Sequence, residues 1–337
     1  MKKINLAIIG VPGMVSLEML KVLEESELQI ANLTLFGLPP DEGKEITFRG
    51  TSIPIKVVGP GSFSQQDIVL IAAGGEASQI LAPQAKQEGA IVIDNSSLWR
   101  LDPAVPLVIP EVNPEDLDWH QGIIANPNCS TIQMLVAIAP IHRKYGIKRI
   151  VVSTYQSASG AGGAGVAELE QQLRNYCQQK PLEVNTFAHQ ILFNLIPHID
   201  VPQANDYTKE EMKMVWETHK MLDPNIEISP TAVRVPVFRS HSESINLELE
   251  QSYDVDELKE LLRSSPGIVV IDDLAAAQYP QPFDVAGKND VFVGRIRRDP
   301  TVEHGVNLWV VADNVRKGAA LNAVQIAEEL LKRNLIQ

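Results

Sequence analysis

The sequence predicts an α/β protein in which a doubly wound parallel sheet is joined to a second domain of α+β type. Its 337 residues exceed what one hydrophobic core usually supports, so about two domains are expected. Up to residue 125, short apolar runs alternate with segments of helical spacing. From residue 149 onward, strand-like runs follow one another with few helices between them.

The first half is expected to contain buried parallel strands, because its apolar runs are continuous rather than alternating. Val15, Met19 and Leu23 recur at helical spacing after the first run, and a second helix is expected over residues 78–88. The expected strands are residues 4–9, 33–36, 68–72, 91–93, 107–109 and 123–125. Strands and helices in this order form a sheet with helices on both faces.

The second half predicts a mixed or antiparallel sheet. A glycine-rich loop is expected at residues 160–165, a polar helix at 166–179 and an amphipathic helix at 319–335. The expected strands are residues 149–156, 232–238, 244–250, 267–271, 291–297 and 306–312. Residues 1–131 with 316–337 are therefore expected to form the first domain, and residues 132–315 the second.

The charge and cysteine content of the chain exclude several classes of protein. The formal net charge is −13, so the surface should repel phosphate backbones, and neither nucleic acid nor a membrane is an expected partner. Two cysteines cannot build a disulfide framework. The apolar run at the amino terminus is too short for a signal-peptide core, and the expected location is cytoplasmic.

The turn after the first strand carries glycines where a phosphate could bind. Gly10 and Gly13 occupy the first two glycine positions of the Rossmann-type fingerprint, and Ser16 occupies the third. Free N–H groups and the helix dipole favour an anion at such a turn. Since short glycine motifs also occur in ordinary turns, nucleotide binding and a plain strand–helix turn both remain open.

Cys129 precedes the apolar pattern of a helix and therefore lies at or just before its start, where N–H groups stabilise a thiolate. A nucleophile and a buried structural cysteine are both compatible with this position. Cys177 lies on a polar helix and has no such setting. Seven histidines could supply the base that a nucleophile needs. They are His120, His142, His189, His198, His219, His241 and His304.

Of these histidines, His241 is the one that falls in a polar interruption, Arg-Ser-His-Ser-Glu-Ser, between two strand-like runs. Catalytic groups are often displayed in such a place. The histidines have no metal-ligand spacing with each other or with the cysteines, so no metal site is expected.

An ordered series of short motifs runs along the chain. They are residues 108–113 (Val-Ile-Pro-Glu-Val-Asn), 127–131 (Pro-Asn-Cys-Ser-Thr), 153–156 (Ser-Thr-Tyr-Gln), 159–162 (Ser-Gly-Ala-Gly), 210–213 (Glu-Glu-Met-Lys), 233–236 (Val-Arg-Val-Pro) with 241–243 (His-Ser-Glu), and 313–314 (Asp-Asn) with 317–320 (Lys-Gly-Ala-Ala). Together they resemble the aspartate-β-semialdehyde dehydrogenase family over nearly the whole chain. The resemblance implies reduction of L-aspartyl-4-phosphate with NADPH, on the route to lysine, methionine and threonine, by a homodimer or homotetramer with a Rossmann-type domain and a catalytic and dimerisation domain.

The resemblance also implies a role for each matching residue. Cys129 would form the thioester and His241 would act as general acid and base, while Gln156 would orient the substrate. The remaining substrate contacts would be Arg234 for the α-carboxylate, Glu210 for the ammonium group, and Arg100, Lys213 and the amide of Asn128 for the phosphate. The cofactor would bind at Gly10, Pro12, Gly13, Met14, Val15, Ser159, Gly160 and Asn314.

The cofactor motifs depart from the family pattern. Pro12 and Ser16 replace a threonine and a glycine of the family turn, and Pro40 and Asp41 replace the Arg-Ser that reads the 2′-phosphate of NADP. An acidic residue can instead accept from a ribose 2′-OH, so NAD is a possible cofactor beside NADP. Two alternatives stay open: a paralogue with impaired cofactor binding and a regulatory or interaction role, and a reductase for another acyl phosphate such as N-acetylglutamyl phosphate.

Overall fold

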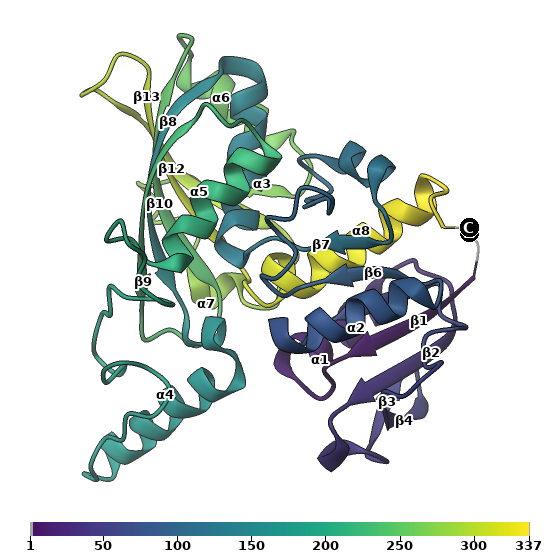
Figure 1. Ribbon diagram of the computed structural model, residues 1–337. Helices are drawn as coiled ribbons and strands as arrows, with labels where there is room; N and C mark the ends of the chain where they lie inside the picture. Colours follow the sequence, from purple (N-terminus) through teal and green to yellow (C-terminus); the bar gives the residue numbers. More distant parts are fainter. Residues whose placement is uncertain (1–2, 337) are drawn as a thin grey trace. The chain divides into compact units, whose positions relative to one another are not determined.

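The computed structural model describes residues 3–336, which form two compact units (Figure 1). The first unit contains the chain up to Pro127 and again from Ala319 onward, and the second runs from Asn128 to Gly318. The functional division expected from the sequence, with limits at residues 131 and 316, stays a prediction.

The first unit is built on a seven-stranded sheet of order β3-β4-β2-β1-β5-β6-β7. Strand β3 is antiparallel to β4, and every other neighbouring pair is parallel. The strands are β1 (Ile4–Ile9), β2 (Ile30–Gly37), β3 (Glu45–Phe48), β4 (Thr51–Val57), β5 (Ile68–Ile71), β6 (Ile91–Asp94) and β7 (Ile123–Ala125). Because β1 lies between β2 and β5, the strand order reverses there, which makes a switch point at the carboxyl ends of β1 and β5.

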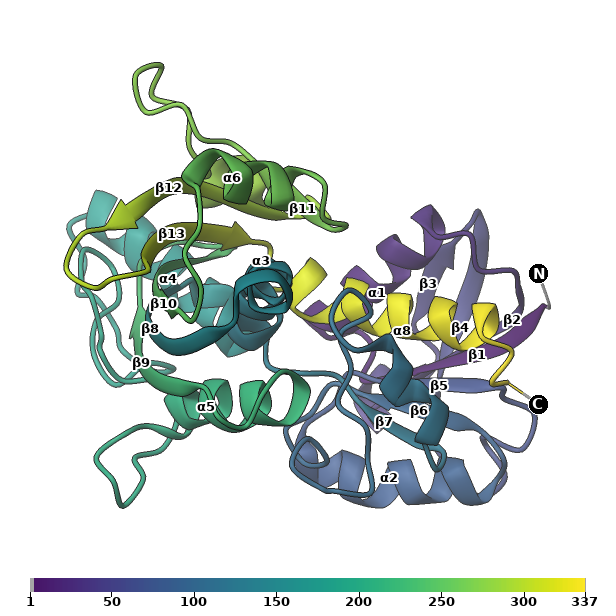
Figure 2. The same cartoon turned by 90° about the horizontal axis from the view of Figure 1, so that it is seen from above.

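Helices cover both faces of this sheet. Figure 2 shows α1 (Met14–Glu25) and α8 (Leu321–Lys332) over one face and α2 (Gly75–Gln87) over the other. Met19 and Leu23 of α1 pack with Val324 of α8 in the same buried core. The carboxyl-terminal helix therefore completes the first unit. The first unit also contains the short helical turns η1 (Pro39–Asp41) and η2 (Pro114–Trp119). The π-helical turn η4 (Arg316–Ala320) begins in the second unit and ends in the first.

The second unit contains a mixed six-stranded sheet of order β11-β12-β13-β10-β8-β9. Helices α3, α5 and α6 lie along one side of it in Figure 1, with α3 packed on β8, β10, β12 and β13. The strands are β8 (Ile147–Gln156), β9 (Glu227–Arg234), β10 (His241–Leu249), β11 (Ile268–Val270), β12 (Val291–Asp299) and β13 (Gly305–Ala312). The helices are α3 (Cys129–Tyr145), η3 (Ala158–Ala161), α4 (Gly162–Cys177), α5 (Lys209–Met221), α6 (Val255–Arg263) and α7 (Pro282–Val285). The predicted fold class is confirmed.

One predicted strand, residues 107–109, is wrong. Leu107 makes only an isolated bridge to Ala125. The side chain of Asn113 takes the place of a neighbouring strand: its Oδ1 accepts from Ile109 N at 3.0 Å and its Nδ2 donates to Leu107 O at 2.8 Å. Pro110 has no N–H and cannot extend a ladder.

Two further predictions in the second half are wrong. Residues 160–165 are not a loop, because α4 begins at Gly162 directly after the turn η3. Gly162 has φ of 73°, which glycine adopts without strain and which joins the two helical segments. His241 does not lie in an interruption between strands but is the first residue of β10, where polar side chains face inward.

The hairpin of β3 and β4 is not among the strands expected from the sequence. Phe48 pairs with Thr51, so the turn consists of Arg49 and Gly50, both at positive φ. A two-residue turn with positive φ at both positions is the preferred hairpin connection. The Arg-Gly pair between two alternating segments is the signal that could have revealed it.

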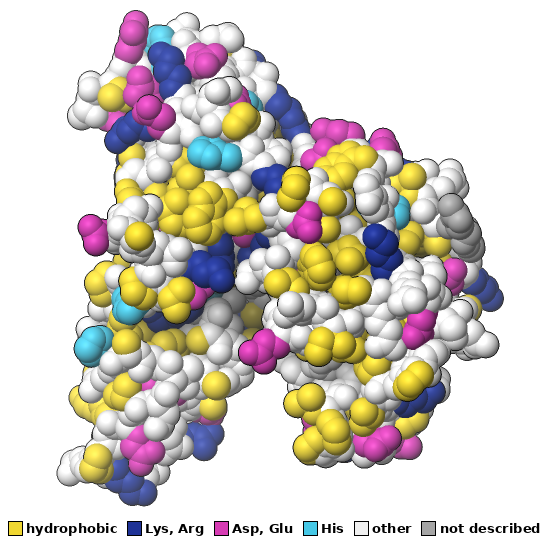
Figure 3. All heavy atoms as spheres, in the orientation of Figure 1, with side chains coloured by type: hydrophobic (Ala, Val, Ile, Leu, Met, Phe, Trp, Pro, Cys, Tyr) yellow, Lys and Arg dark blue, Asp and Glu magenta, His cyan; other side chains and the backbone are white. Residues whose placement is uncertain are grey.

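Within residues 3–336, every helix falls short of the length and apolar character that a membrane span needs. On the face shown in Figure 3, Lys and Arg side chains lie as separate groups among acidic and uncharged ones.

Candidate functional site

The first residue of α3 is Cys129, a partly exposed thiol. Asn128 caps this helix: its side-chain Oδ1 accepts hydrogen bonds from Ser130 N at 3.0 Å and Thr131 N at 3.3 Å. A polar residue with extended backbone at this position is a standard helix start. The predicted location of Cys129 is therefore confirmed, and the positive end of the helix dipole favours its thiolate.

Gly318 packs directly against Cys129. A Cβ built on Gly318 would lie 2.9 Å from the Cβ of Cys129 and 3.3 Å from its Cα. Only glycine leaves room for the first turn of α3 here, which explains the Lys-Gly-Ala-Ala motif in physical terms.

Strand register brings three of the predicted residues to one end of the second sheet. Gln156 of β8 pairs with Arg234 of β9. On the other side of β8, Tyr155 pairs with Ser242 of β10, so His241 lies next to Gln156 in the same row. Side chains of a row project from the same face of a sheet. Arg234, Gln156 and His241 thus share one face although the sequence separates them by up to 85 positions.

His241 is fully buried, and its two ring nitrogens differ. Nδ1 accepts a hydrogen bond from Ser157 N at 3.1 Å, so the neutral ring carries its hydrogen on Nε2. Nε2 has no partner among the described residues. Burial, and then the charge of Arg234, lower the pKa of His241 to about 3. The result is a neutral imidazole with an unused donor.

Ser159 and Asn314 belong to the network behind His241. Asn314 Oδ1 accepts from Ser159 Oγ at 3.0 Å, Ser157 Oγ at 3.2 Å and Ser240 N at 3.0 Å. These bonds use only the oxygen of the Asn314 amide, so its nitrogen is not committed by them. Ser159 and Asn314 thus bond the hydroxyl of Ser157, which lies 3.1 Å from His241 Nδ1. Their role in cofactor binding stays a prediction.

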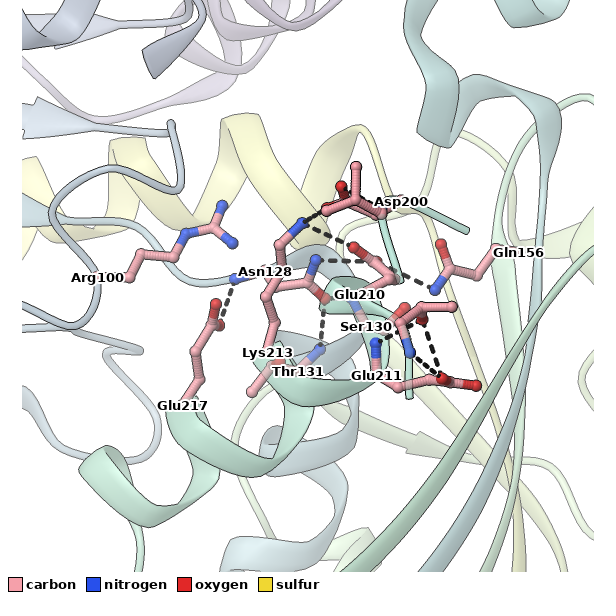
Figure 4. A network of polar contacts seen from close by, with 12 residues as sticks. Arg100, Asn128, Ser130, Thr131, Gln156, Asp200, Glu210, Glu211, Lys213 and Glu217 are labelled. Atoms are coloured by element: carbon pink, nitrogen blue, oxygen red, sulfur yellow. Dashed lines mark hydrogen bonds and ion pairs between the residues drawn. The ribbon is translucent and has the colours of Figure 1, made fainter. Parts of the chain in front are cut away.

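Glu210, in the first turn of α5, is the centre of the polar network in Figure 4. Its Oε1 accepts from Asn128 Nδ2 at 3.0 Å and from Gln156 Nε2 at 3.2 Å. Its Oε2 binds Lys213 Nζ at 2.9 Å. Burial alone would raise the pKa of Glu210, but Lys213 and the two amides lower it to about 2. The carboxylate is therefore charged at all ordinary pH values.

Two acidic residues that the sequence analysis did not single out hold the predicted phosphate ligands. Asp200 Oδ2 accepts from Lys213 Nζ at 2.7 Å. Glu217 Oε2 accepts from the main-chain N–H of Asn128 at 2.7 Å. Glu217 follows Lys213 by four residues on α5, and this helical spacing is the signal that could have placed both on one face.

Arg234 is buried at the carboxyl end of β9, and its Nη1 donates to Ser157 O at 2.8 Å. Burial lowers the pKa of Arg234, although Glu210 and Cys129 oppose this shift. An arginine remains charged even so. A Cβ built on Gly160 would lie 2.4 Å from Arg234 Nη1 and 3.1 Å from the His241 ring, so Gly160 keeps space open beside both side chains.

Arg100 lies in the first unit and is buried there. Its Nε donates to Asn126 O at 2.9 Å and its Nη2 donates to Asn95 O at 3.0 Å. These carbonyls fix the plane of the guanidinium group. A phosphate role for Arg100 stays a prediction.

A cavity of about 600 Å³ opens at the switch point of the first sheet. Its wall includes the predicted residues Gly10, Pro12 and Gly13, with Leu38, Pro39 and Asp41 from the segment after β2. Gly10 has φ of 99°, and a Cβ there would lie 2.6 Å from Ala72 O. Met14 and Val15, also predicted, begin α1, whose first N–H groups have no intrahelical partners.

Ser16, in the third glycine position of the turn, is fully buried. Its hydroxyl donates to the carbonyl oxygens of Gly10 and Gly13, both at 2.9 Å. The serine therefore fits between helix and strand and holds the turn closed. Asp41, at the cavity wall, forms an ion pair with Lys44 at 2.6 Å.

Comparison with known proteins shows which family the chain resembles. The family model described as semialdehyde dehydrogenase, NAD binding domain, matches residues 5–120, and the semialdehyde dehydrogenase dimerisation domain matches residues 138–317. An aspartate-semialdehyde dehydrogenase of Aquifex aeolicus is 51% identical, covering 98% of this chain and 99% of its own. Aspartate-semialdehyde dehydrogenase 2 of Vibrio cholerae is 49% identical over 98% of both chains.

Solved structures give the same result. The structure of aspartate semialdehyde dehydrogenase II complexed with ASA from Vibrio cholerae has a TM-score of 0.96, with 48% identity over 98% of this chain and 99% of that one. A probable aspartate-semialdehyde dehydrogenase from Pseudomonas aeruginosa has a TM-score of 0.92 at 29% identity, with the same coverage. The chain belongs to the aspartate-semialdehyde dehydrogenase family.

Proposed function

We propose that this chain catalyses the NAD(P)H-dependent reductive dephosphorylation of L-aspartyl-4-phosphate to aspartate semialdehyde, and the phosphorylating oxidation in reverse. The observation that carries this proposal is Cys129 at the start of α3, in one compact unit with Arg234, Glu210 and His241. Relatives of this name, about half identical over their full lengths, support it. A regulatory paralogue would not need this set of groups.

The reaction begins with covalent catalysis by Cys129. Its thiolate attacks the acyl carbon, a C–S bond forms, and the C–O bond to phosphate breaks with the electron pair leaving on phosphate. The helix start stabilises the thiolate before attack. The nicotinamide cofactor, when bound, supplies the hydride that reduces the acyl group.

His241 then stabilises the charge that develops on the substrate oxygen. Oxygen charge develops whenever the acyl carbon becomes tetrahedral, and the Nε2–H of a neutral imidazole is a suitable donor to it. Ser157 N holds Nδ1 as the acceptor, so the donor stays on the other nitrogen. The proton stays on Nε2 throughout. Collapse of the hydride adduct re-forms the C=O bond of the aldehyde, breaks the C–S bond and restores the Cys129 thiolate.

Two buried charges would fix the amino acid part of the substrate. Arg234 presents its remaining N–H groups to the α-carboxylate, because Nη1 is held by Ser157 O. The charged Glu210 carboxylate would receive the ammonium group. Gln156, which already donates to Glu210, lies in the same row and would orient the acyl group.

The phosphate would bind Lys213 with Arg100 and Asn128. Lys213 uses two of its three donors on Asp200 and Glu210, so one remains for a phosphate oxygen. The main-chain N–H of Asn128 donates to Glu217. We therefore propose that this N–H binds the phosphate only after its hydrogen bond to Glu217 breaks.

The cavity at the switch point fits a dinucleotide. Gly10 allows the turn to pass close to Ala72 O, and the open helix start after Gly13 offers the free N–H groups that a pyrophosphate requires. Residues Gly10, Pro12, Gly13, Met14 and Val15 would hold it, with Ser159, Gly160 and Asn314 toward the nicotinamide.

We further propose that NADP preference is relaxed and that NAD is also accepted. The segment after β2 places Asp41 at the cavity wall, and Lys44 forms an ion pair with it. The carboxylate of an acidic residue can accept a hydrogen bond from the ribose 2′-OH of NAD, whereas it repels the 2′-phosphate of NADP. In Asp41→Arg we expect kcat/KM with NADPH to rise about tenfold and that with NADH to fall. A strong wild-type preference for NADPH contradicts this proposal.

The match to a dimerisation domain indicates an oligomer, and we propose a homodimer or homotetramer. The sheet face opposite α3 supports this, because Tyr155 and Trp309 lie together there with ring centroids 5.7 Å apart and both remain partly exposed. Sedimentation analysis of the full chain decides the number of copies. We also keep a cytoplasmic location as a proposal.

A spectrophotometric assay tests the activity. Aspartate semialdehyde and phosphate are supplied with NADP or NAD, and formation of reduced nicotinamide is followed. Cys129→Ala should abolish it while the fold persists, whereas Cys177→Ala, at an exposed position, should leave it unchanged. Residual activity in Cys129→Ala removes Cys129 as the nucleophile. An intact mass after incubation with the acyl phosphate alone should show an aspartyl adduct.

A further inference from the structure

A second row of residues lies directly beneath the row of Arg234, Gln156 and His241. In it, Glu243 of β10 pairs with Thr154 of β8 on one side and with Val310 of β13 on the other. Glu243 is fully buried, and neither of its carboxyl oxygens has a hydrogen-bond partner among the described residues. An unpaired carboxylate in such a place would be costly.

These surroundings favour the neutral acid form of Glu243 over the carboxylate. Burial raises the pKa of Glu243 well above its usual value, and the neighbouring Gln133 side chain only partly offsets this rise. A neutral carboxyl group has one O–H donor, which a carboxylate lacks.

The acceptor that matches this donor comes from α3. Gln133 is fully buried and lies four residues after Cys129, on the same face of the helix. Its Nε2 donates to the main-chain oxygen of His241 at 3.4 Å. Its Oε1 has no partner among the described residues, and the Gln133 side chain is close enough to Glu243 to act on the pKa of that carboxyl group.

We propose that Glu243 and Gln133 form a positioning pair, in which the Glu243 O–H donates to Gln133 Oε1 and Gln133 Nε2 holds the carbonyl of His241. The pair connects the first turns of α3, which carry Cys129, to the start of β10, which carries His241. It fixes the distance between Cys129 and His241 without touching the substrate. This inference rests on the proposed roles of those two residues.

Three variants test the pair. Glu243→Gln keeps the size and can still donate, so kcat should stay within about threefold of wild type. Glu243→Leu keeps the size but cannot donate, and kcat should fall about 30- to 100-fold, the cost of a small misplacement of reacting groups. KM for aspartate semialdehyde should change less than twofold in both, because neither residue contacts the substrate. Gln133→Leu should resemble Glu243→Leu.

A double variant separates a pair from two independent packing effects. Glu243→Leu combined with Gln133→Leu should lose no more than the worse single variant, because the partners act together. The proposal is overturned if the fold-losses in kcat of the two single variants multiply in the double variant. It is also overturned if kcat of Glu243→Gln is as low as that of Glu243→Leu, or if Glu243→Leu keeps the wild-type kcat. Should Glu243→Leu fail to fold, the comparison of Glu243→Gln with Gln133→Leu carries the test.

Failure of this inference is distinguishable from failure of the proposed function. Wild-type protein is assayed first, and Glu248→Gln, on the same strand but facing the other side, serves as the matched control with wild-type kcat. An inactive wild type contradicts the proposed function. An active wild type with fully active Glu243→Leu contradicts only the positioning pair.

Discussion

Ser157 and His241 are joined by a hydrogen bond from the main-chain N–H of one to the Nδ1 of the other, at 3.1 Å. Because a main-chain N–H can only donate, this contact decides the tautomer of the imidazole. It also favours the neutral ring, since a protonated ring would set two donors against each other. Burial acts in the same direction on the pKa of His241.

The low pKa of His241 predicts a dependence of stability on pH. The unfolded chain takes up a proton on this histidine near pH 6.5, whereas the folded protein does so only near pH 3. The free energy of unfolding should therefore decrease as the pH falls through this window. Denaturant titrations should show a smaller decrease in His241→Asn. An equal pH slope in both proteins would mean that folding does not lower the pKa of His241.

Arg234→Lys should reduce kcat/KM for aspartate semialdehyde by about 10²- to 10³-fold. Lysine keeps the charge but loses both the bond that holds the group to Ser157 O and the forked geometry that a carboxylate needs. Steady-state kinetics check this. The exposed Arg297→Lys is the control and should behave as wild type. Unchanged kinetics in Arg234→Lys would place the carboxylate elsewhere.

Gly318→Ala should lower kcat about 10- to 100-fold. The added Cβ meets the Cβ and main chain of Cys129, which cannot move without shifting the first turn of α3. The rate of alkylation of Cys129 should change with kcat. Gly163→Ala provides the matched control, because a Cβ there meets nothing within 4 Å. Equal effects of the two substitutions would contradict a specific role for Gly318.

Local patterns predicted much of this molecule. Strand β1 is recognised by its apolar run, and the start of α3 by Asn128 followed by apolar residues at helical spacing from Ile132 onward. Both signals depend only on neighbouring residues, and both elements lie where expected. The segment 107–109 failed because its polar partner is the side chain of Asn113, which periodicity does not reveal. The spacing of apolar residues could not distinguish a strand in the sheet from a segment whose main chain is hydrogen-bonded to the Asn113 side chain.

The site depends on register, which no local pattern contains. Gln156 and Arg234 are neighbours because β8 and β9 are parallel and aligned in that register. Resemblance to a family supplied the residue types, but not the acceptors Asp200 and Glu217 that hold Lys213 and Asn128. Those contacts arise from the packing of α5, so they become visible only in the folded chain.

Glu210 should act on both substrate binding and acid stability, and the two effects can be measured separately. The pKa of its carboxyl group is about 2 in the folded protein, against an ordinary value of 4.5. Its contribution to stability is therefore complete above pH 4.5 and is lost as the pH falls toward 2. Glu210→Gln can still accept from Asn128 and Gln156 but leaves Lys213 with one carboxylate instead of two.

In Glu210→Gln we expect KM for aspartate semialdehyde to rise at least about 30-fold at neutral pH, because the ammonium group loses its counter-charge. Between pH 4.5 and 3 the variant should lose less unfolding free energy than wild type, since one shifted carboxyl is gone. Asp200→Asn is the matched control: it also removes a partner of Lys213, but it touches neither Asn128 nor Gln156 among the bonds formed here, so its KM should rise far less. If Asp200→Asn and Glu210→Gln raise KM equally, the effect comes through Lys213, and Glu210 is not the ammonium site.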